Sequence, residues 1–152
     1  MRLWRLALPR FASALDGEGA RLFGGRWNSR GIPAVYSSKG PSTALLELLV
    51  HGDPEEWPDE YSLIELIAPD SLGTEVIAYA EFPANWRNVP HHPWFREIGD
   101  RWLLGQSTAL LEVPSVVVPA EANVLINPRH PDAAEITVGS IQPFPLDERF
   151  KR

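Results

Sequence analysis

The chain has 152 residues, of which 20 are acidic and 14 are lysine or arginine, giving a formal net charge of −6. This length predicts one domain with a substantial core, and the negative charge argues against direct nucleic-acid binding, because phosphate binding needs a basic surface. The absence of cysteine excludes disulfides, thiolate zinc sites and a cysteine nucleophile.

The first predicted elements surround a glycine-rich segment. RLWRLAL, residues 2–8, predicts a strand that ends at Pro9. DGEGARLFGG, residues 16–25, is expected to be a loop because of its glycines. Residues 32–38 then predict a second strand.

A helix is predicted between Gly40 and Gly52. Pro41 suits the first helical position, and Gly52, followed closely by a proline, predicts the helix end. At helical spacing its leucines form one apolar arc, and Glu47 lies on the opposite side. The arc consists of Leu45, Leu46, Leu48 and Leu49.

The rest of the chain predicts further strands and a second helix. Pro114 interrupts one strand and therefore places it at a sheet edge or at a bend. Trp86 and Trp94 are expected to anchor the proline-rich segment 81–93 to the core. The strands are predicted over 61–68, 74–80, 109–119, 122–126 and 135–147, and the helix over 94–107.

These elements together predict an α+β fold, a single compact domain of short mixed strands and a few helices. No apolar run approaches the length of a membrane span, and the N-terminus makes a poor signal peptide. We therefore expect a soluble, cytoplasmic protein without membrane contact.

Arg26 is the first candidate for a binding role. Two glycines precede it, so the backbone can bend and present the guanidinium from a loop. Its planar, permanent charge suits a phosphate or a carboxylate. The side chain can equally pair with one of the acidic residues, and so short a motif does not separate the two alternatives. Trp27 beside it is expected to anchor the loop.

Glu47 is the second candidate. It can orient a ribose hydroxyl or stabilise positive charge at an anomeric carbon. Periodicity alone favours a solvated glutamate, since the residue lies opposite an apolar arc. Thr43 and Ala44, one turn earlier, are small and would leave room for a ligand.

Other polar residues have simple structural explanations when taken alone. Tyr36 is expected in the core, Ser115 next to backbone groups, and Asn127 in a turn before its proline. The histidines form no metal-binding pattern, so we expect no metal. His51 is explained as a favourable charge at a helix C-terminus.

Four motifs nevertheless occur in a specific order along the chain: GGRWNSRGIPAVYSS, STALLELLVHG, LEVPSVVVPAEANVLINPRHP and FPLDERF. Their order and spacing resemble the RES-domain family, whose name refers to an arginine, a glutamate and a serine. The family supplies the toxins of bacterial toxin–antitoxin pairs with Xre-type antitoxins. The similarity extends over nearly the whole chain, so residues 1–152 are identified as a single RES domain.

The resemblance implies an ADP-ribosyltransferase-like fold and an enzyme that consumes NAD⁺. Family members release nicotinamide by hydrolysis or phosphorolysis, or transfer ADP-ribose to a protein, and the motifs do not separate these outcomes. NAD⁺ is then a substrate, with inorganic phosphate as a candidate co-substrate and no other cofactor. A non-catalytic nucleotide-binding module remains an alternative. The resemblance also implies a hetero-oligomer in which an Xre-type antitoxin covers the active site and makes any DNA contact.

Carried over by motif, the resemblance assigns roles to individual residues. Glu47 is expected beneath the reacting ribose, where positive charge develops as the nicotinamide bond breaks. Arg26 is expected to grip the pyrophosphate or an attacking phosphate. Tyr36 is expected to enclose the nicotinamide, and Ser115 and Asn127 to bond its amide or its ribose. The catalytic set is Arg26, Tyr36, Glu47 and Ser115; the substrate-binding set is Arg26, Trp27, Asn28, Tyr36 and Asn127.

Overall fold

A computed structural model describes residues 1–151, in which seven strands form one mixed sheet in the order β4-β5-β6-β2-β1-β3-β7. Neighbouring strands pair antiparallel except β4 and β5, which are parallel. The strands are β1 (Arg2–Ala7), β2 (Val35–Ser38), β3 (Glu60–Ile67), β4 (Thr74–Val76), β5 (Leu110–Pro114), β6 (Ala122–Ile126) and β7 (Thr137–Pro145). The helices are α1 (Glu18–Phe23), α2 (Pro41–His51) and α3 (Pro93–Gly105).

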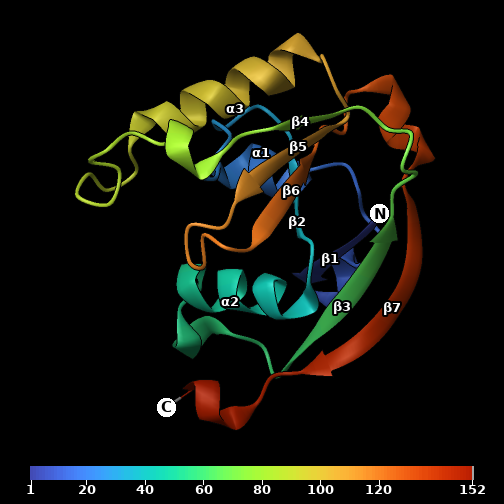
Figure 1. The fold of residues 1–152 in the computed structure, drawn as a ribbon. Coiled ribbons are helices and arrows are strands. Elements are labelled where there is room, and N and C mark those ends of the chain that lie inside the picture. Colours follow the sequence, from blue (N-terminus) through green and yellow to red (C-terminus); the bar gives the residue numbers. More distant parts are fainter. Residues whose placement is uncertain (152) are drawn as a thin grey trace.

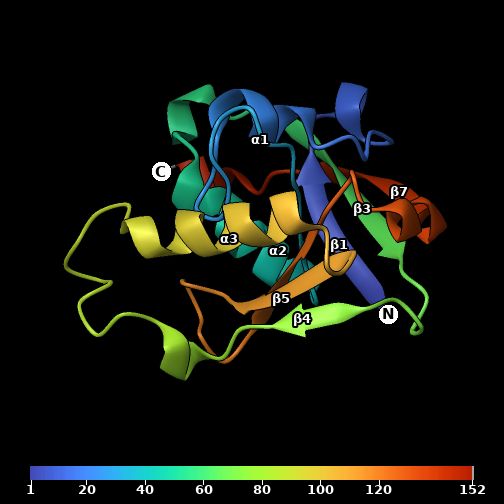
Figure 2. The ribbon, with the colours of Figure 1, turned by 90° about the horizontal axis from the view of Figure 1, so that it is seen from above.

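The strand register places the side chains that α2 and α3 contact on one face of the sheet. In Figure 1 α3 runs along the top, beside β4 and β5, and α2 lies below it. Three of the four leucines of α2 pack with Leu6 of β1 and Phe144 of β7, whereas Leu46 is 38% exposed. Helix α3 packs on Leu111 of β5 and Leu125 of β6. Strand β2 lies between these two halves, and the view from above shows α3 crossing the molecule in front of α2 (Figure 2). The side chains of β2 on this face are therefore left between the helices.

The opposite face of the sheet carries a separate apolar core. Buried side chains alternate along the strands, as a two-residue period requires, so that Ile64 and Leu66 of β3 point to this core. Leu3, Val35 and Leu110 join them from other strands. Because the central strands are packed on both faces, the β2 side chains between α2 and α3 start from a fixed backbone.

Most predicted elements are confirmed, including the strands near residues 2–8, 61–68 and 122–126. The proline-rich segment packs as expected, with Trp86 and Trp94 against the α3 core. The C-terminal segment 135–147 forms one edge strand, β7, which tolerates prolines because its outer side has no strand to pair with.

Three predictions are wrong in part. The segment 16–25, predicted as a loop, contains α1: Gly17 and Gly24 lie at the two ends of the helix, and Gly19 adopts helical backbone in its first turn. The strand expected over 74–80 stops at Val76 and gives way to a short 3-10 turn. Strand β5 lies inside the sheet, so the edge alternative is wrong, whereas the bend alternative holds: the strand ends at Pro114 and residues 116–118 bend.

Candidate active site

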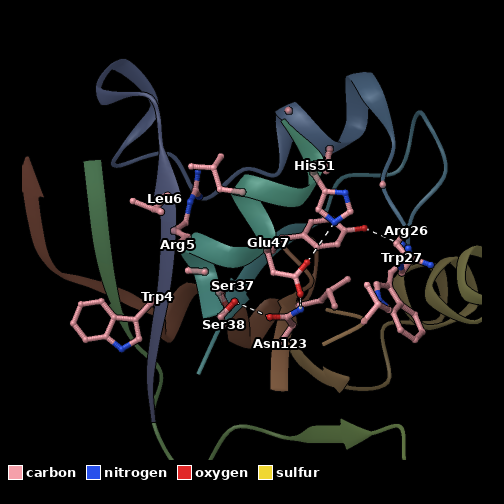
Figure 3. A pocket seen from close by; sticks show the side chains of 18 of the residues that line it. Trp4, Arg5, Leu6, Arg26, Trp27, Ser37, Ser38, Glu47, His51 and Asn123 are labelled. Atoms are coloured by element: carbon pink, nitrogen blue, oxygen red, sulfur yellow. Dashed lines mark hydrogen bonds and ion pairs between the residues drawn. The ribbon is translucent and has the colours of Figure 1, made fainter. Parts of the chain in front are cut away.

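A cavity of about 660 Å³ opens between α1, α2 and the central strands. Its wall combines Phe23 of α1, Arg26 and Trp27 of the following loop, and Glu47 and His51 of α2. Strands β1, β2 and β6 complete it with Trp4, Tyr36, Ser38 and Asn123, and Figure 3 shows these elements around the Glu47 carboxylate. The cavity thus lies over the strand that α2 and α3 leave uncovered.

The Glu47 carboxylate is held by donors from three parts of the chain. Ser115 Oγ and Asn123 Nδ2 both donate to Oε1, each at 2.7 Å. The other oxygen, Oε2, lies 3.3 Å from Nε2 of His51, one helical turn later (Figure 3). Only 19% of the side chain is exposed, so the expectation of a solvated glutamate is wrong. The face of α2 opposite its leucines meets the cavity, not bulk water.

These contacts decide the charge of Glu47. Burial alone would raise the pKa of the carboxyl, because it penalises the ionised form. The hydrogen bonds from His51, Asn123 and Ser115 oppose this and leave the pKa below its ordinary value. The cavity therefore contains a carboxylate that stays ionised at neutral pH.

Arg26 brings the opposite charge to the same cavity. Its Nε is buried without a hydrogen-bond partner, and within residues 1–151 no carboxylate lies at salt-bridge distance from it. The guanidinium carbon lies 5.0 Å from the centre of the Phe95 ring, a cation–π contact that supports the side chain from α3. Burial lowers the pKa of Arg26, while the charge of Glu47 acts against this shift. Its donors are available to an anion.

Tyr36 lines the cavity and connects β2 to the arginine loop, residues 24–34, which carries Arg26. Its hydroxyl donates to Asn28 Oδ1 at 2.7 Å and accepts the backbone N–H of Trp27 at 3.0 Å. Burial raises the pKa of this phenol, so it stays neutral. Since the hydroxyl is used within the protein, the ring is the part of Tyr36 that remains for a ligand.

Helix α3 supports the arginine loop from behind. Asp100 accepts hydrogen bonds from both the backbone N–H and the hydroxyl of Ser29. At Gly99 the helix comes so close that an added Cβ would lie 1.8 Å from the carbonyl oxygen of Trp27. The loop that presents Arg26 is therefore a packed part of the structure.

Several residues expected at the substrate lie elsewhere. Ser115 is fully buried behind Glu47, and its oxygen also accepts the N–H groups of Val117 and Val118. Asn127 is buried away from the cavity and donates to the Leu103 carbonyl of α3. In this structure both side chains are hydrogen-bonded within the protein, and neither lines the cavity.

The two neighbours of Arg26 also act mainly within the protein. Asn28 is buried and donates to the carbonyls of Ala20 and Ile32, which closes the loop. Trp27 touches the cavity, but only 3% of it is exposed because its ring packs edge-on against Phe95. The prediction of Trp27 as a loop anchor is confirmed, whereas substrate binding by Asn28 is not supported.

The structure adds residues that the sequence did not indicate. Asn123 both donates to Glu47 and accepts a hydrogen bond from Ser38 at 2.6 Å, which links β6, β2 and α2. Finding it requires the β2–β6 register, in which Ser38 pairs with Asn123. For His51 the sequence does contain a signal: it follows Glu47 by four residues, the spacing of neighbours on one helix face.

No group of three or more histidine or acidic side chains within residues 1–151 has the arrangement of a metal site. Across the same residues no helix combines the length and apolar character that spanning a bilayer requires.

Comparison with known proteins gives consistent matches. A family model described as the RES domain matches residues 2–147. Toxin Res of Yersinia enterocolitica serotype O:8 / biotype 1B is 38% identical over 154 residues, covering 99% of this chain and 100% of the relative. Prs ADP-ribosylating toxin of Sphingobium sp. strain YBL2 is 38% identical over 154 residues, covering 98% and 96%. Toxin Res of Pseudomonas putida is 36% identical over 155 residues, covering 99% of both chains.

A solved structure shares the fold. It is described as the crystal structure of the M. tuberculosis MbcT-MbcA toxin-antitoxin complex, and it matches with a TM-score of 0.76. The match covers 95% of this chain and 84% of the other, at 16% sequence identity. At this identity the match shows a shared α+β fold and nothing about activity.

Proposed function

The chain belongs to the RES-domain family, and from that premise we propose that it is an NAD⁺-degrading toxin of a bacterial toxin–antitoxin pair. It cleaves the bond between nicotinamide and ribose and so depletes the cell of NAD⁺. The relatives named as toxins support the first part of this proposal. The observation that carries the second is Glu47, a largely buried and ionised carboxylate. It shares its cavity with Arg26, whose buried Nε has no hydrogen-bond partner within residues 1–151.

The chemistry needs negative charge beneath the sugar. As the C–N bond breaks, its electron pair moves to the nicotinamide nitrogen, which loses its positive charge, and C1′ of the ribose takes on oxocarbenium character. A fixed carboxylate stabilises that cation, and because it is already oriented it needs no rearrangement at the moment of reaction. Nicotinamide leaves as a neutral molecule, so no general acid is required.

Arg26 is proposed to bind the anionic part of the reactants. The N–H groups of its guanidinium can bind the pyrophosphate of NAD⁺ or an incoming inorganic phosphate through charge-assisted hydrogen bonds. The cavity restricts where the anion lies relative to Glu47, while the Tyr36 ring contributes an apolar wall for the nicotinamide. Water as nucleophile gives ADP-ribose and a proton; phosphate gives the 1-phosphate of ADP-ribose.

A protein ADP-ribosyltransferase is the second candidate. One relative of comparable identity is named Prs ADP-ribosylating toxin, and it covers almost the whole chain. The same first step serves both activities, because only the nucleophile that attacks the ribose differs.

The test is nicotinamide release from NAD⁺ by the purified protein, with and without inorganic phosphate. We expect Glu47→Gln to lower the rate by about 100- to 1,000-fold, the usual loss when one electrostatic stabiliser is removed. Glu97→Gln is the matched control, because Glu97 is an exposed glutamate on α3, and it should keep the wild-type rate.

The other outcomes separate the alternatives. Release that depends on phosphate identifies a phosphorylase, and release without phosphate identifies a hydrolase. Label from NAD⁺ on one protein band of a lysate, without bulk nicotinamide release, identifies the transferase. Saturable binding with no turnover identifies a non-catalytic module, and wild-type turnover by Glu47→Gln means that the reaction occurs elsewhere.

We also propose an Xre-type antitoxin that covers the cavity. The fold match is to a toxin described in complex with its antitoxin, which supports a protein partner. Phe23 lies at the cavity and is 75% exposed, and Leu22 beside it is 51% exposed. An exposed apolar rim around a polar site is the kind of surface that a protein partner covers.

A further inference from the structure

We propose that His51 is a positioning residue for Glu47: it fixes the carboxylate oxygen that the sheet leaves free and so sets the orientation in which Glu47 meets the ribose. This inference deepens the proposed function and rests on it for the identity of the substrate. It gives His51 a role beyond that of a favourable charge at the end of α2.

The two oxygens of Glu47 have different environments. Oε1 accepts from Ser115 and Asn123, both of which are attached to the sheet end and the adjoining turn. Neither of these donors contacts Oε2, which is 3.3 Å from His51 Nε2. A carboxylate held only at Oε1 can still tilt about that oxygen through coupled changes of its side-chain torsions, and this tilt moves Oε2. The contact at Oε2 opposes the tilt, so His51 completes the orientation.

His51 is also the accessible donor. Ser115 is fully buried, whereas the His51 side chain is 56% exposed and lines the cavity. A ribose hydroxyl that approaches Oε2 can share this oxygen with the imidazole, while the bonds at Oε1 stay in place. The geometry therefore divides the donors into a fixed pair and an accessible one.

Position at the helix end does not account for this contact. A histidine in the last turn interacts favourably with the helix dipole wherever its ring points. Here the ring points back along α2 toward Glu47 (Figure 3). In the part of the chain that the structure describes, no lysine or arginine side chain lies within salt-bridge distance of Glu47.

The test compares His51→Leu, which removes the donor, with His51→Gln, whose amide N–H can take the place of Nε2–H. We expect His51→Leu to lower kcat about tenfold or more with KM for NAD⁺ within twofold, as for other residues that orient a reacting group. His51→Gln should recover most of kcat. Val50→Ala, at the neighbouring exposed position, is the control for changes at the helix end.

A second measurement needs no turnover. In protein labelled with ¹³C at glutamate side-chain carboxyls, the pKa of Glu47 should rise in His51→Leu and stay near the wild-type value in His51→Gln, because only the former loses the donor. This holds even if the wild type releases no nicotinamide, an outcome that refutes the proposed function alone.

Three results would overturn the inference. An unchanged Glu47 pKa in His51→Leu means that the contact does not form in solution. Equal loss of kcat in both variants points to a proton-transfer or charge role that glutamine cannot supply. Unchanged kcat in both, or losses that follow a lower melting temperature in both, leaves His51 with the helix-end role only.

Discussion

Glu47 keeps its charge in a place where most glutamates would lose it. The cost of burial falls on the ionised form, and specific donors more than offset it. Because the folded-state pKa is depressed, this carboxylate stabilises the fold above its unfolded pKa of about 4.3, and the contribution is lost as pH falls through the lower folded value. The site is thus built to remain anionic under mildly acidic conditions.

Ser115 provides the first prediction. Ser115→Ala removes one donor from Oε1 but no group that can touch NAD⁺, since the side chain is fully buried. We expect kcat to fall about tenfold with KM nearly unchanged. Loss of a donor to the ionised form raises the pKa of Glu47, so the rate should also decline at a higher pH than in the wild type as the solution is acidified.

The measurement is a pH series of kcat and KM for nicotinamide release. Ser62→Ala is a suitable control, because Ser62 is a buried serine of β3 that does not line the cavity. A rise in KM without a change in kcat would restore the original expectation that Ser115 binds the substrate directly.

At the level of residues, the sequence predicts the charged members of the site better than their partners. Arg26 and Glu47 belong to recognisable motifs, and the structure places both at one cavity. Asn123 has no local signature, because its importance depends on pairing with Ser38 across the sheet. Asn127, which does belong to a motif, turns out to join β6 to α3.

At the level of elements, α3 gives the arginine loop its shape without contributing to the cavity wall. Gly99→Ala places a methyl group against the Trp27 carbonyl, so helix and loop must separate. We expect the free energy of unfolding to fall by about 1–3 kcal/mol, as for other overpacked contacts, and nicotinamide release to fall with it. Urea denaturation and the release assay measure the two effects.

Gly105 offers a control on the same helix. An added Cβ there meets nothing within 4 Å, and the residue is helical without a positive φ. Gly105→Ala should therefore raise the free energy of unfolding by about 0.5–1 kcal/mol and leave the rate unchanged. Equal behaviour of the two variants would show that α3 does not press on the arginine loop.

The elements differ in how well the sequence predicts them. The start and end of α2 follow from Pro41 and Gly52 because both residues act locally. The sequence does not predict helix α1, because glycines commonly interrupt helices. Here Gly24 ends the helix, and Asn28 donates a hydrogen bond to the Ala20 carbonyl of its last turn. The interior position of β5 depends on its parallel pairing with β4, a contact between distant segments that no local sequence pattern indicates.

At the level of the whole molecule, the proposal predicts an effect on growth. Production of the chain alone should arrest bacterial growth and lower cellular NAD⁺, and Glu47→Gln at the same protein level should do neither. Co-production of the Xre-type partner should restore growth by closing the cavity. Arrest by the Glu47→Gln variant would show that toxicity does not come from this site.

The dispersal of the Glu47 donors along the chain has a consequence for biosynthesis. Glu47 and His51 are synthesised early, Ser115 much later, and Asn123 belongs to β6, near the end of the sequence. A nascent chain that has not passed β6 lacks half of the fixed donor pair and the strand that carries it. The ribosome must therefore release most of this protein before the carboxylate has the environment that keeps it charged and in place.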